Sequence, residues 1–293
     1  MRTGEKQSLL NRFLDENGEF SKASNLVNLV QILIENGASV NECEEGFASP
    51  LIKAVRLSSF ELVDLLLRQG ANVNHHGKNG FTALHECCIK GKFEVEDPNT
   101  EIFNLLLGAG ASVNSQASSV NTPVTGIYPD RQNKEGTTCL MLAVSNYSLI
   151  KQLLDIGADP TVQDQNGNTV LHHLCSTTLK RKKKGEILEL LLKSGTDINV
   201  LNHEGYTPLN LMIKEKTNLN VEDVQDLLMQ KAGPNICLKG CNSPLINSLL
   251  RCKLDVASYL LKAGGDVKHE GKSGLTALHA VLNLELTSGK SDI

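Results

Sequence analysis

Residues 65–88 read LLLRQGANVNHHGKNGFTALHECC, and this stretch determines how the rest of the chain is interpreted. An apolar run ends at Gly70, a polar segment with two more glycines follows, and Thr82 stands directly before a second apolar run. Glycine is common just after a helix, because it adopts the left-handed conformation there without strain. Threonine is common just before a helix, because its hydroxyl accepts hydrogen bonds from the free amide groups of the first turn. The stretch therefore predicts the end of one helix, a turn and the start of another.

Both marker residues recur along the chain. Positions equivalent to Thr82 are Ser49, Thr138, Thr169, Thr207, Ser243 and Thr276. Positions assigned as equivalent to Gly70 are Gly37, Gly110, Gly157, Gly195, Gly233 and Gly264. Ser49 to Gly70 is 21 residues and Gly70 to Thr82 is 12, and the segment from Ser243 through Gly264 to Thr276 repeats both spacings. A fixed period of 33 residues indicates a repeat protein.

Each period contains a short helix with a Thr or Ser cap, a second helix with one apolar face, such as FELVDLLLRQ, and a glycine turn. Such a unit can bury its apolar face only against its neighbours. The units resemble ankyrin repeats, whose family pattern is G-x-T-P-L-H-x-A-A followed by V-x-L-L-L-x-x-G-A-D-x-N. The resemblance covers residues 25–290. It implies an all-α ankyrin-repeat solenoid of stacked helix–turn–helix units with hairpin loops, with about seven repeats and a partial C-terminal one.

The domain organisation follows from departures from this pattern. We expect a capping helix and loop over residues 1–24 and the solenoid over 25–293. A long hairpin insertion is predicted at 115–134, and extensions between the two helices of a repeat near 91–100, 178–186 and 214–223. The last repeat, 271–293, is incomplete, because only 17 residues follow Thr276 where 21 are needed. We therefore expect the chain to be an isoform or fragment of a longer protein.

The sequence predicts no metal, cofactor or catalytic residue. His85, Cys87 and Cys88 are all zinc-ligating residue types, but the His85 position is Ile52 and Met141 in other repeats. A buried histidine bonded to neighbouring backbone explains that variation, and metal ligation does not. Cys237 and Cys241 have no second pair at ligand spacing. The chain is therefore expected not to be an enzyme. A metal-dependent or redox protein is the alternative, which bound zinc or a reactive thiol would reveal.

Charge and cysteine usage limit the partners and the compartment. The formal charge of −4 does not suggest nucleic-acid binding, and no apolar run is long enough for a membrane span. Eight scattered cysteines without a signal sequence suit free thiols in the cytoplasm, with the nucleus as a second location. One dense basic run is a nuclear-import signal or a reader of anionic patches, with a solvated turn between two helices as the alternative. It consists of Lys180, Arg181, Lys182, Lys183 and Lys184.

A solenoid supplies a long concave surface, so we expect a monomeric, non-catalytic scaffold that binds a partner protein there and has no small-molecule substrate. The family resemblance implies contacts at the hairpin tips and the exposed side of the first helices. The matching positions are Lys78, Asn79, Phe81, Lys90, Gln165, Asn166, His203, Glu204, Tyr206 and Lys272. Phe81 and Tyr206 are the first choice, since exposed aromatic residues tend to dominate interfaces. Packing of both rings against the adjacent hairpin is the equal alternative.

Two further expectations come from the resemblance. The repeats suit a substrate-recruiting or regulatory arm of a larger multidomain enzyme, such as a ubiquitin ligase, as an alternative function. Hairpin asparagines of ankyrin repeats are also substrates of an asparaginyl hydroxylase. That position is filled by Asn41, Asn74, Asn114 and Asn199. The alternative role of these asparagines is to tie the hairpin together.

Overall fold

The computed structural model describes residues 14, 24–43, 48–77, 80–90, 98–116 and 136–288. Within these residues the secondary structure is helical, with no strand and one isolated β-bridge between Tyr206 and Cys237. The chain divides into two compact units, Met1–Ala158 and Asp159–Ile293. None of the helices in the described ranges is long and apolar enough to cross a membrane.

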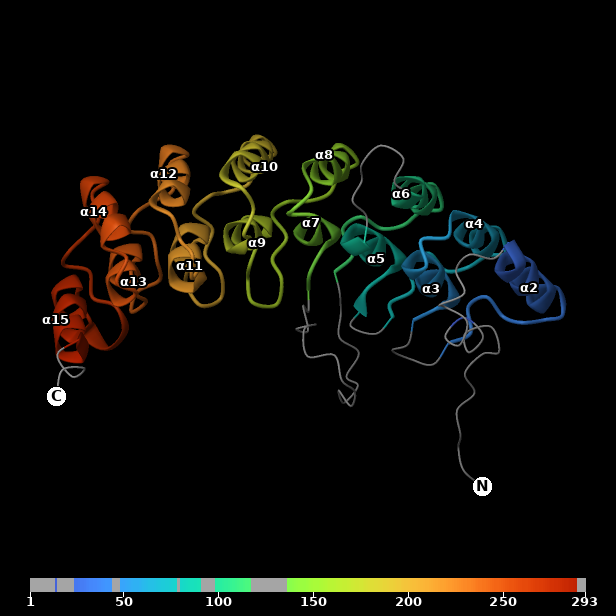
Figure 1. Ribbon diagram of the computed structural model, residues 1–293, viewed down its shortest axis with the longest axis horizontal. Coiled ribbons are helices and arrows are strands. Elements are labelled where there is room, and N and C mark those ends of the chain that lie inside the picture. The colour runs from blue at the N-terminus through green and yellow to red at the C-terminus, as the bar shows by residue number, and fades with distance from the viewer. Residues whose placement is uncertain are drawn as a thin grey trace, which may run out of the picture. The chain divides into compact units, whose positions relative to one another are not determined.

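In the first unit, helices that begin after a Thr or Ser marker form an inner row, and helices that end before a glycine marker form an outer row (Figure 1). The inner helices are α3 (Pro50–Arg56), α5 (Ala83–Lys90) and α7 (Cys139–Leu142). The outer helices are α2 (Ser24–Glu35), α4 (Phe60–Arg68), α6 (Pro98–Gly108) and α8 (Tyr147–Asp155). Each inner helix packs against the next inner helix, so the apolar face of one repeat is buried by its neighbour.

The second unit has the same two rows (Figure 1). Its inner helices are α9 (Val170–Ser176), α11 (Pro208–Glu215), α13 (Pro244–Leu250) and α15 (Ala277–Ser288), and the 3₁₀ turn η3 (Lys272–Gly274) precedes α15. Its outer helices are α10 (Arg181–Lys193), α12 (Val221–Met229) and α14 (Leu254–Lys262). The core consists mainly of Leu, Ile, Val and Ala from both rows. The predicted all-α repeat fold is confirmed.

The two marker residues have the predicted roles. The Ser49 hydroxyl accepts from the Ile52 amide at 3.4 Å, and the Thr207 hydroxyl accepts from the Asn210 amide at 3.2 Å. Gly70 has a φ of 79°, in the left-handed region that follows a helix end. The helix boundaries were therefore predictable from these residue types.

One residue assigned from the sequence as equivalent to Gly70 is wrong. The residue equivalent to Gly70 in the turn after α12 is Lys231, with a φ of 68°, and not Gly233. The Asn199 side chain donates to the carbonyl of Lys231 at 3.3 Å, as Asn41 donates to that of Gly70 at 2.9 Å. The hairpin from Lys231 to Ser243 therefore has the standard length of 12 residues, and the extension near 214–223 is shorter than predicted.

Lys231 occupies a backbone conformation that costs an L-residue about 1–2 kcal/mol. Gly adopts the same conformation without that cost. We expect Lys231→Gly to stabilise the protein by about 1 kcal/mol, measured as an increased midpoint in urea unfolding. Lys231→Ala keeps the left-handed strain and removes the charge, and a gain of equal size in that control would show that charge, not backbone strain, is responsible.

Of the other predicted insertions, only the one near 178–186 lies within the described residues. Most of 91–100 and nearly all of 115–134 lie outside the described residues, so both stay predictions. Near 178–186, however, the extra residues mainly lengthen α10, which begins at Arg181 and has 13 residues where α4 has 9. The basic run therefore forms the first turn of a helix, and its interpretation as a turn between helices is wrong.

Candidate functional site

The histidines after the Thr markers are structural. Thr169 N–H donates to His172 Nδ1 at 3.1 Å, and Nε2–H donates to the carbonyl oxygen of Tyr206 at 3.1 Å. His85 makes the same pair of bonds, with Thr82 and with the carbonyl of Thr137. Burial lowers the pKa of each of these two histidines to about 4, so both are neutral at physiological pH. The prediction of buried, backbone-bonded histidines is confirmed for His85 and His172, whereas the equivalent His279 is exposed.

The cysteines near His85 are buried with it. Cys87 Sγ donates to the carbonyl of Asn99 at 3.4 Å. A hydrogen bond with Cys139, together with burial, raises the pKa of the Cys88 thiol. Burial likewise raises the pKa of Cys175 to about 11, so these buried thiols are poor nucleophiles. Within the described part of the chain, no group of three or more His, Cys, Asp or Glu side chains could hold a metal ion.

The hairpin asparagines form a chain of contacts between successive repeats. Asn74 donates to the carbonyl of Gly110 at 3.0 Å and accepts from the Ser112 amide at 2.8 Å. Asn41, Asn114 and Asn199 each donate to the equivalent carbonyl of the next repeat. This geometry ties hairpins together, and hydroxylation at these positions stays a prediction.

A fifth asparagine of this kind escaped the sequence interpretation. Asn235 donates to the carbonyl of Gly264 and accepts from the Asp266 amide, at 2.9 and 2.8 Å. It was missed because the frame was set on Gly233 instead of Lys231. The signal was present, since Asn235 lies 29 residues before Gly264 just as Asn41 lies 29 before Gly70.

The two aromatic residues predicted as exposed contacts are buried. Phe81 is 8% exposed and stacks on the ring of His85, with the centroids 5.5 Å apart. Tyr206 is 1% exposed and packs with Leu211 and Cys241. Phe81 contacts His85 of its own repeat, and Tyr206 contacts Cys241 of the next hairpin. The expectation of exposure is therefore wrong, and for Tyr206 the alternative of packing against the adjacent hairpin is the one the structure has. The same position, directly before the Thr or Ser marker, is Ala48 in an earlier repeat and is buried there as well. A small apolar residue at this position was the sequence signal for a buried site.

The other predicted tip residues of the second unit are exposed and lie on adjacent hairpins. Gln165 and Asn166 form one tip, and His203 and Glu204 form the next. The His203 amide donates to the carbonyl of Asn166 at 2.9 Å, and its ring Nδ1 bonds to the carbonyl of Gln165 at 2.9 Å. A Cβ at Gly167 would lie 2.5 Å from the His203 nitrogen, so glycine is required for this stacking.

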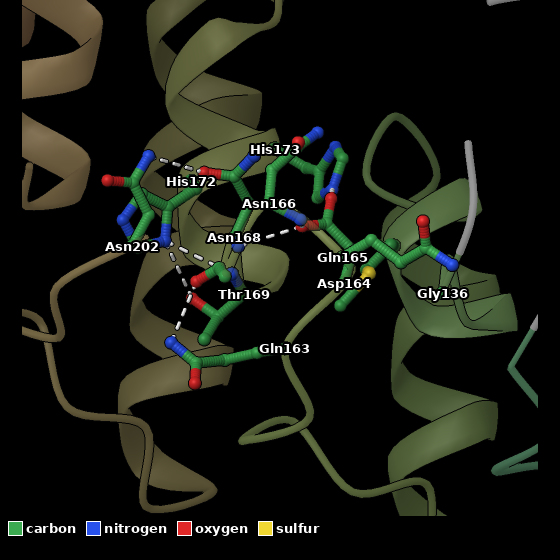
Figure 2. Close-up of polar contacts among 12 residues, drawn as sticks. Gly136, Gln163, Asp164, Gln165, Asn166, Asn168, Thr169, His172, His173 and Asn202 are labelled. Carbon is green, nitrogen blue, oxygen red and sulfur yellow. Dashed lines mark hydrogen bonds and ion pairs between the residues drawn. The ribbon is translucent and has the colours of Figure 1, made fainter. Parts of the chain in front are cut away.

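A buried carboxylate holds the first of these tips in shape (Figure 2). Asp164 Oδ1 accepts from the amides of Asn166 and Asn168, at 2.9 and 2.8 Å. Asp164 Oδ2 lies 2.9 Å from His173 Nε2. Burial alone would raise the pKa of Asp164, but the hydrogen bonds from His173 and the two amides together lower it. The tip is therefore a pre-formed structure.

The third tip carries an exposed leucine that the sequence interpretation missed. Leu238 is 53% exposed, and its amide donates to the carbonyl of Gly205 at 3.0 Å. Cys241 Sγ donates to the carbonyl of Glu204 at 3.0 Å, which places this tip directly beside the second one. The equivalent position in the other described hairpins is polar or glycine, as in Gly77, Asp164, Asn202 and Gly271. An apolar residue at that position was the available signal.

We call these exposed residues the hairpin-tip surface. It consists of Gln165, Asn166, His203, Glu204, Leu238, Lys239 and Lys272. The Glu204 carboxylate lies 2.5 Å from Lys214 Nζ, and that ammonium group lies 4.6 Å from the centroid of the Tyr206 ring. The surface therefore presents one apolar side chain among charged and amide groups.

The remaining predicted positions contribute less. Lys78 and Asn79 lie outside the described residues. Lys90 is exposed, and its ammonium group donates to the carbonyl of Arg56.

In the basic run, Lys184 is 7% exposed and donates to the carbonyl of Cys175 at 3.2 Å. Arg181 makes an ion pair with Asp226 at 2.7 Å. Nuclear import by this run stays a prediction, with Lys180, Lys182 and Lys183 exposed.

Comparison with known proteins agrees with the repeat geometry. A family model for ankyrin repeats matches residues 20–117, 120–202 and 140–221. The chain therefore belongs to the ankyrin repeat family. Ankyrin repeats indicate a protein-interaction scaffold.

Individual relatives are distant and longer. Human ankyrin repeat and SOCS box protein 6 is 28% identical over 195 residues, 66% of this chain and 42% of its own length. Human ankyrin repeat and SOCS box protein 16 is 28% identical over 210 residues, 62% of this chain and 44% of its own. The mouse B-cell lymphoma 3 protein homolog is 29% identical over 159 residues, 52% of this chain and 34% of its own. The chain thus spans less than half the length of these relatives.

Proposed function

We propose that the chain is a monomeric, non-catalytic scaffold that binds a partner protein on the hairpin-tip surface, with Leu238 as the apolar anchor. The observation that carries this proposal is the 53% exposure of Leu238 at a turn position that is polar or glycine in the other described hairpins. Exposed side chains that become buried at the centre of an interface contribute most of the binding free energy. His203, Glu204, Lys239 and Lys272 supply the polar rim that such an anchor needs.

The backbone of this surface is suited to binding without rearrangement. The Asp164 hydrogen bonds fix the first tip, and the His203 amide bond to Asn166 fixes the second tip against it. Asn235 fixes the hairpin that carries Leu238 to the next repeat. Because these loops are already ordered in the folded chain, little conformational entropy is lost when a partner binds, which favours affinity.

The test is affinity capture from cell lysate with the wild type and two matched variants. Leu238→Asp removes the anchor, and Leu254→Asp makes the same change at a 61% exposed leucine at the start of outer helix α14. We expect a partner captured by the wild type and by Leu254→Asp to be lost with Leu238→Asp. Capture that is equal in all three, with folding checked by circular dichroism, contradicts the proposed surface.

A second candidate function is a substrate-recruiting arm of a ubiquitin ligase. It is supported by the SOCS box in the names of two relatives, each of which is more than twice as long as the segment matched. Mass spectrometry of the natural protein tests it. A mass well above 31.8 kDa with co-captured ubiquitin-ligase subunits supports this function, and a 31.8 kDa chain without them argues against it.

A further inference from the structure

Residues of α10 and α12, together with Gln230, line a groove. Both helices belong to the outer row (Figure 1). The volume of the groove is about 490 Å³, and Leu188, which is 4% exposed, lies at its base. Arg181 and Asp226 also line the groove, and the Arg181 guanidinium bonds to both carboxylate oxygens of Asp226 at 2.7 Å. The groove is separate from the hairpin-tip surface and shares no residue with it.

Gly185 lines the groove without a side chain. The equivalent position in the other repeats always has a side chain: Val27, Phe60, Thr100, Tyr147, Val221 and Leu254. Glycine within a helix costs about 1 kcal/mol relative to alanine. No atom lies within 4 Å of a Cβ built on Gly185, so packing does not require glycine here. Gly185 therefore leaves this position without a side chain, unlike the other repeats.

The groove is also lined by Met229, which is 74% exposed. The equivalent position in the other repeats is charged or glycine: Glu35, Arg68, Gly108, Asp155, Lys193 and Lys262. Methionine is a flexible, polarisable side chain that adapts to apolar partners. Gly185 and Met229 are therefore two independent departures from the repeat pattern, one on each of the two helices that line this groove.

The charge beside the groove is uneven. Lys182 lines it, and Lys180 and Lys183 are exposed nearby, with no ion pair to these three lysines among the described residues. The charge of Arg181 is already balanced by Asp226. Further along α10, Glu186 and Glu189 also line the groove and are exposed, so its positive charge is confined to the part near Lys182. An acidic group is favoured in that part only.

We propose that the α10–α12 groove is a second protein-binding site, which takes one bulky apolar side chain from a peptide segment with acidic residues beside it. The apolar side chain occupies the space above Gly185 and contacts Leu188 and Met229. The acidic residues lie near Lys182 and Lys183. This site goes beyond the proposed hairpin-tip function, because it uses different helices and a different ligand chemistry.

The test uses a phage library of random 12-residue peptides and the full chain. The library is depleted on Gly185→Phe and then selected on the wild type. We expect enriched peptides with Phe, Leu or Met next to Asp or Glu. A synthetic peptide of the enriched sequence should bind at least about tenfold more weakly to Gly185→Phe, whose ring fills the groove, and to Lys182→Glu/Lys183→Glu.

Two control variants keep the result interpretable. Gly185→Ala strengthens the helix but leaves the groove open, so the peptide should bind it as it binds the wild type. Leu238→Asp should also leave peptide binding unchanged, which separates this site from the hairpin-tip surface. The proposal is overturned if no sequence is enriched, if the enriched peptides lack acidic residues, or if folded Gly185→Phe binds them as well as the wild type.

Discussion

Lowering the pH from 7.5 to 5 is expected to destabilise the folded chain by about 2 kcal/mol for each of two histidines. His85 and His172 have a pKa of about 4 in the folded chain, against an ordinary value of 6.5. Between these values the unfolded chain binds a proton that the folded chain excludes. Stability therefore falls as the pH decreases from 6.5 towards 4, and each histidine contributes no further loss below that.

The chain itself suggests the matched variant for this test. Asn210 occupies the histidine position in a neighbouring repeat and donates to the carbonyl of Asn242 at 2.8 Å. His172→Asn should therefore keep a similar bond to Tyr206 and reduce the pH-dependent loss measured by urea unfolding at pH 7.5 and 5. A His172→Asn variant with the full wild-type pH dependence would contradict the assignment.

Tyr206→Ala is expected to destabilise the protein by about 3–5 kcal/mol, as large-to-small changes in a core do. Tyr206 is 1% exposed and packs with Leu211 and Cys241. The loss should be seen as a lower urea midpoint by circular dichroism. Any loss of partner binding in this variant then comes from unfolding and not from a missing contact.

Tyr206→Phe is the control for that interpretation. It keeps the buried ring and the cation–π contact with Lys214, so the urea midpoint should stay close to that of the wild type. If Tyr206→Ala instead unfolded at the wild-type midpoint and lost its partner, Tyr206 would be an interface residue after all, as the sequence had suggested.

The fold was predictable because its signals are local. A Thr or Ser cap, an apolar helical face and a left-handed glycine act within a few residues, and the period of 33 joins them into repeats. The one frame error arose where Lys231 adopts the left-handed conformation that usually belongs to glycine. The nearby Gly233 was assigned as the marker in place of Lys231, and the shifted frame left Asn235 unrecognised as a hairpin asparagine.

The site was less predictable because exposure depends on neighbours. Phe81 and Tyr206 occupy positions near the hairpin tips, but both are buried, Phe81 against His85 and Tyr206 against Cys241 of the next hairpin. Leu238 is exposed for the converse reason, since it lies over Gly205 and not in the core. In the basic run, Lys184 is buried because it lies four residues before the buried Leu188 and so on the same face of the helix.

The most direct test of the scaffold assignment is the affinity of the purified chain for its captured partner, measured by isothermal titration calorimetry. Wild type, Leu238→Asp and Leu254→Asp are compared under identical conditions. We expect Leu238→Asp to bind about 30-fold or more weakly, as loss of a central anchor costs about 2 kcal/mol or more. Leu254→Asp should bind as the wild type does. Equal affinity of all three folded proteins would contradict a binding surface centred on Leu238.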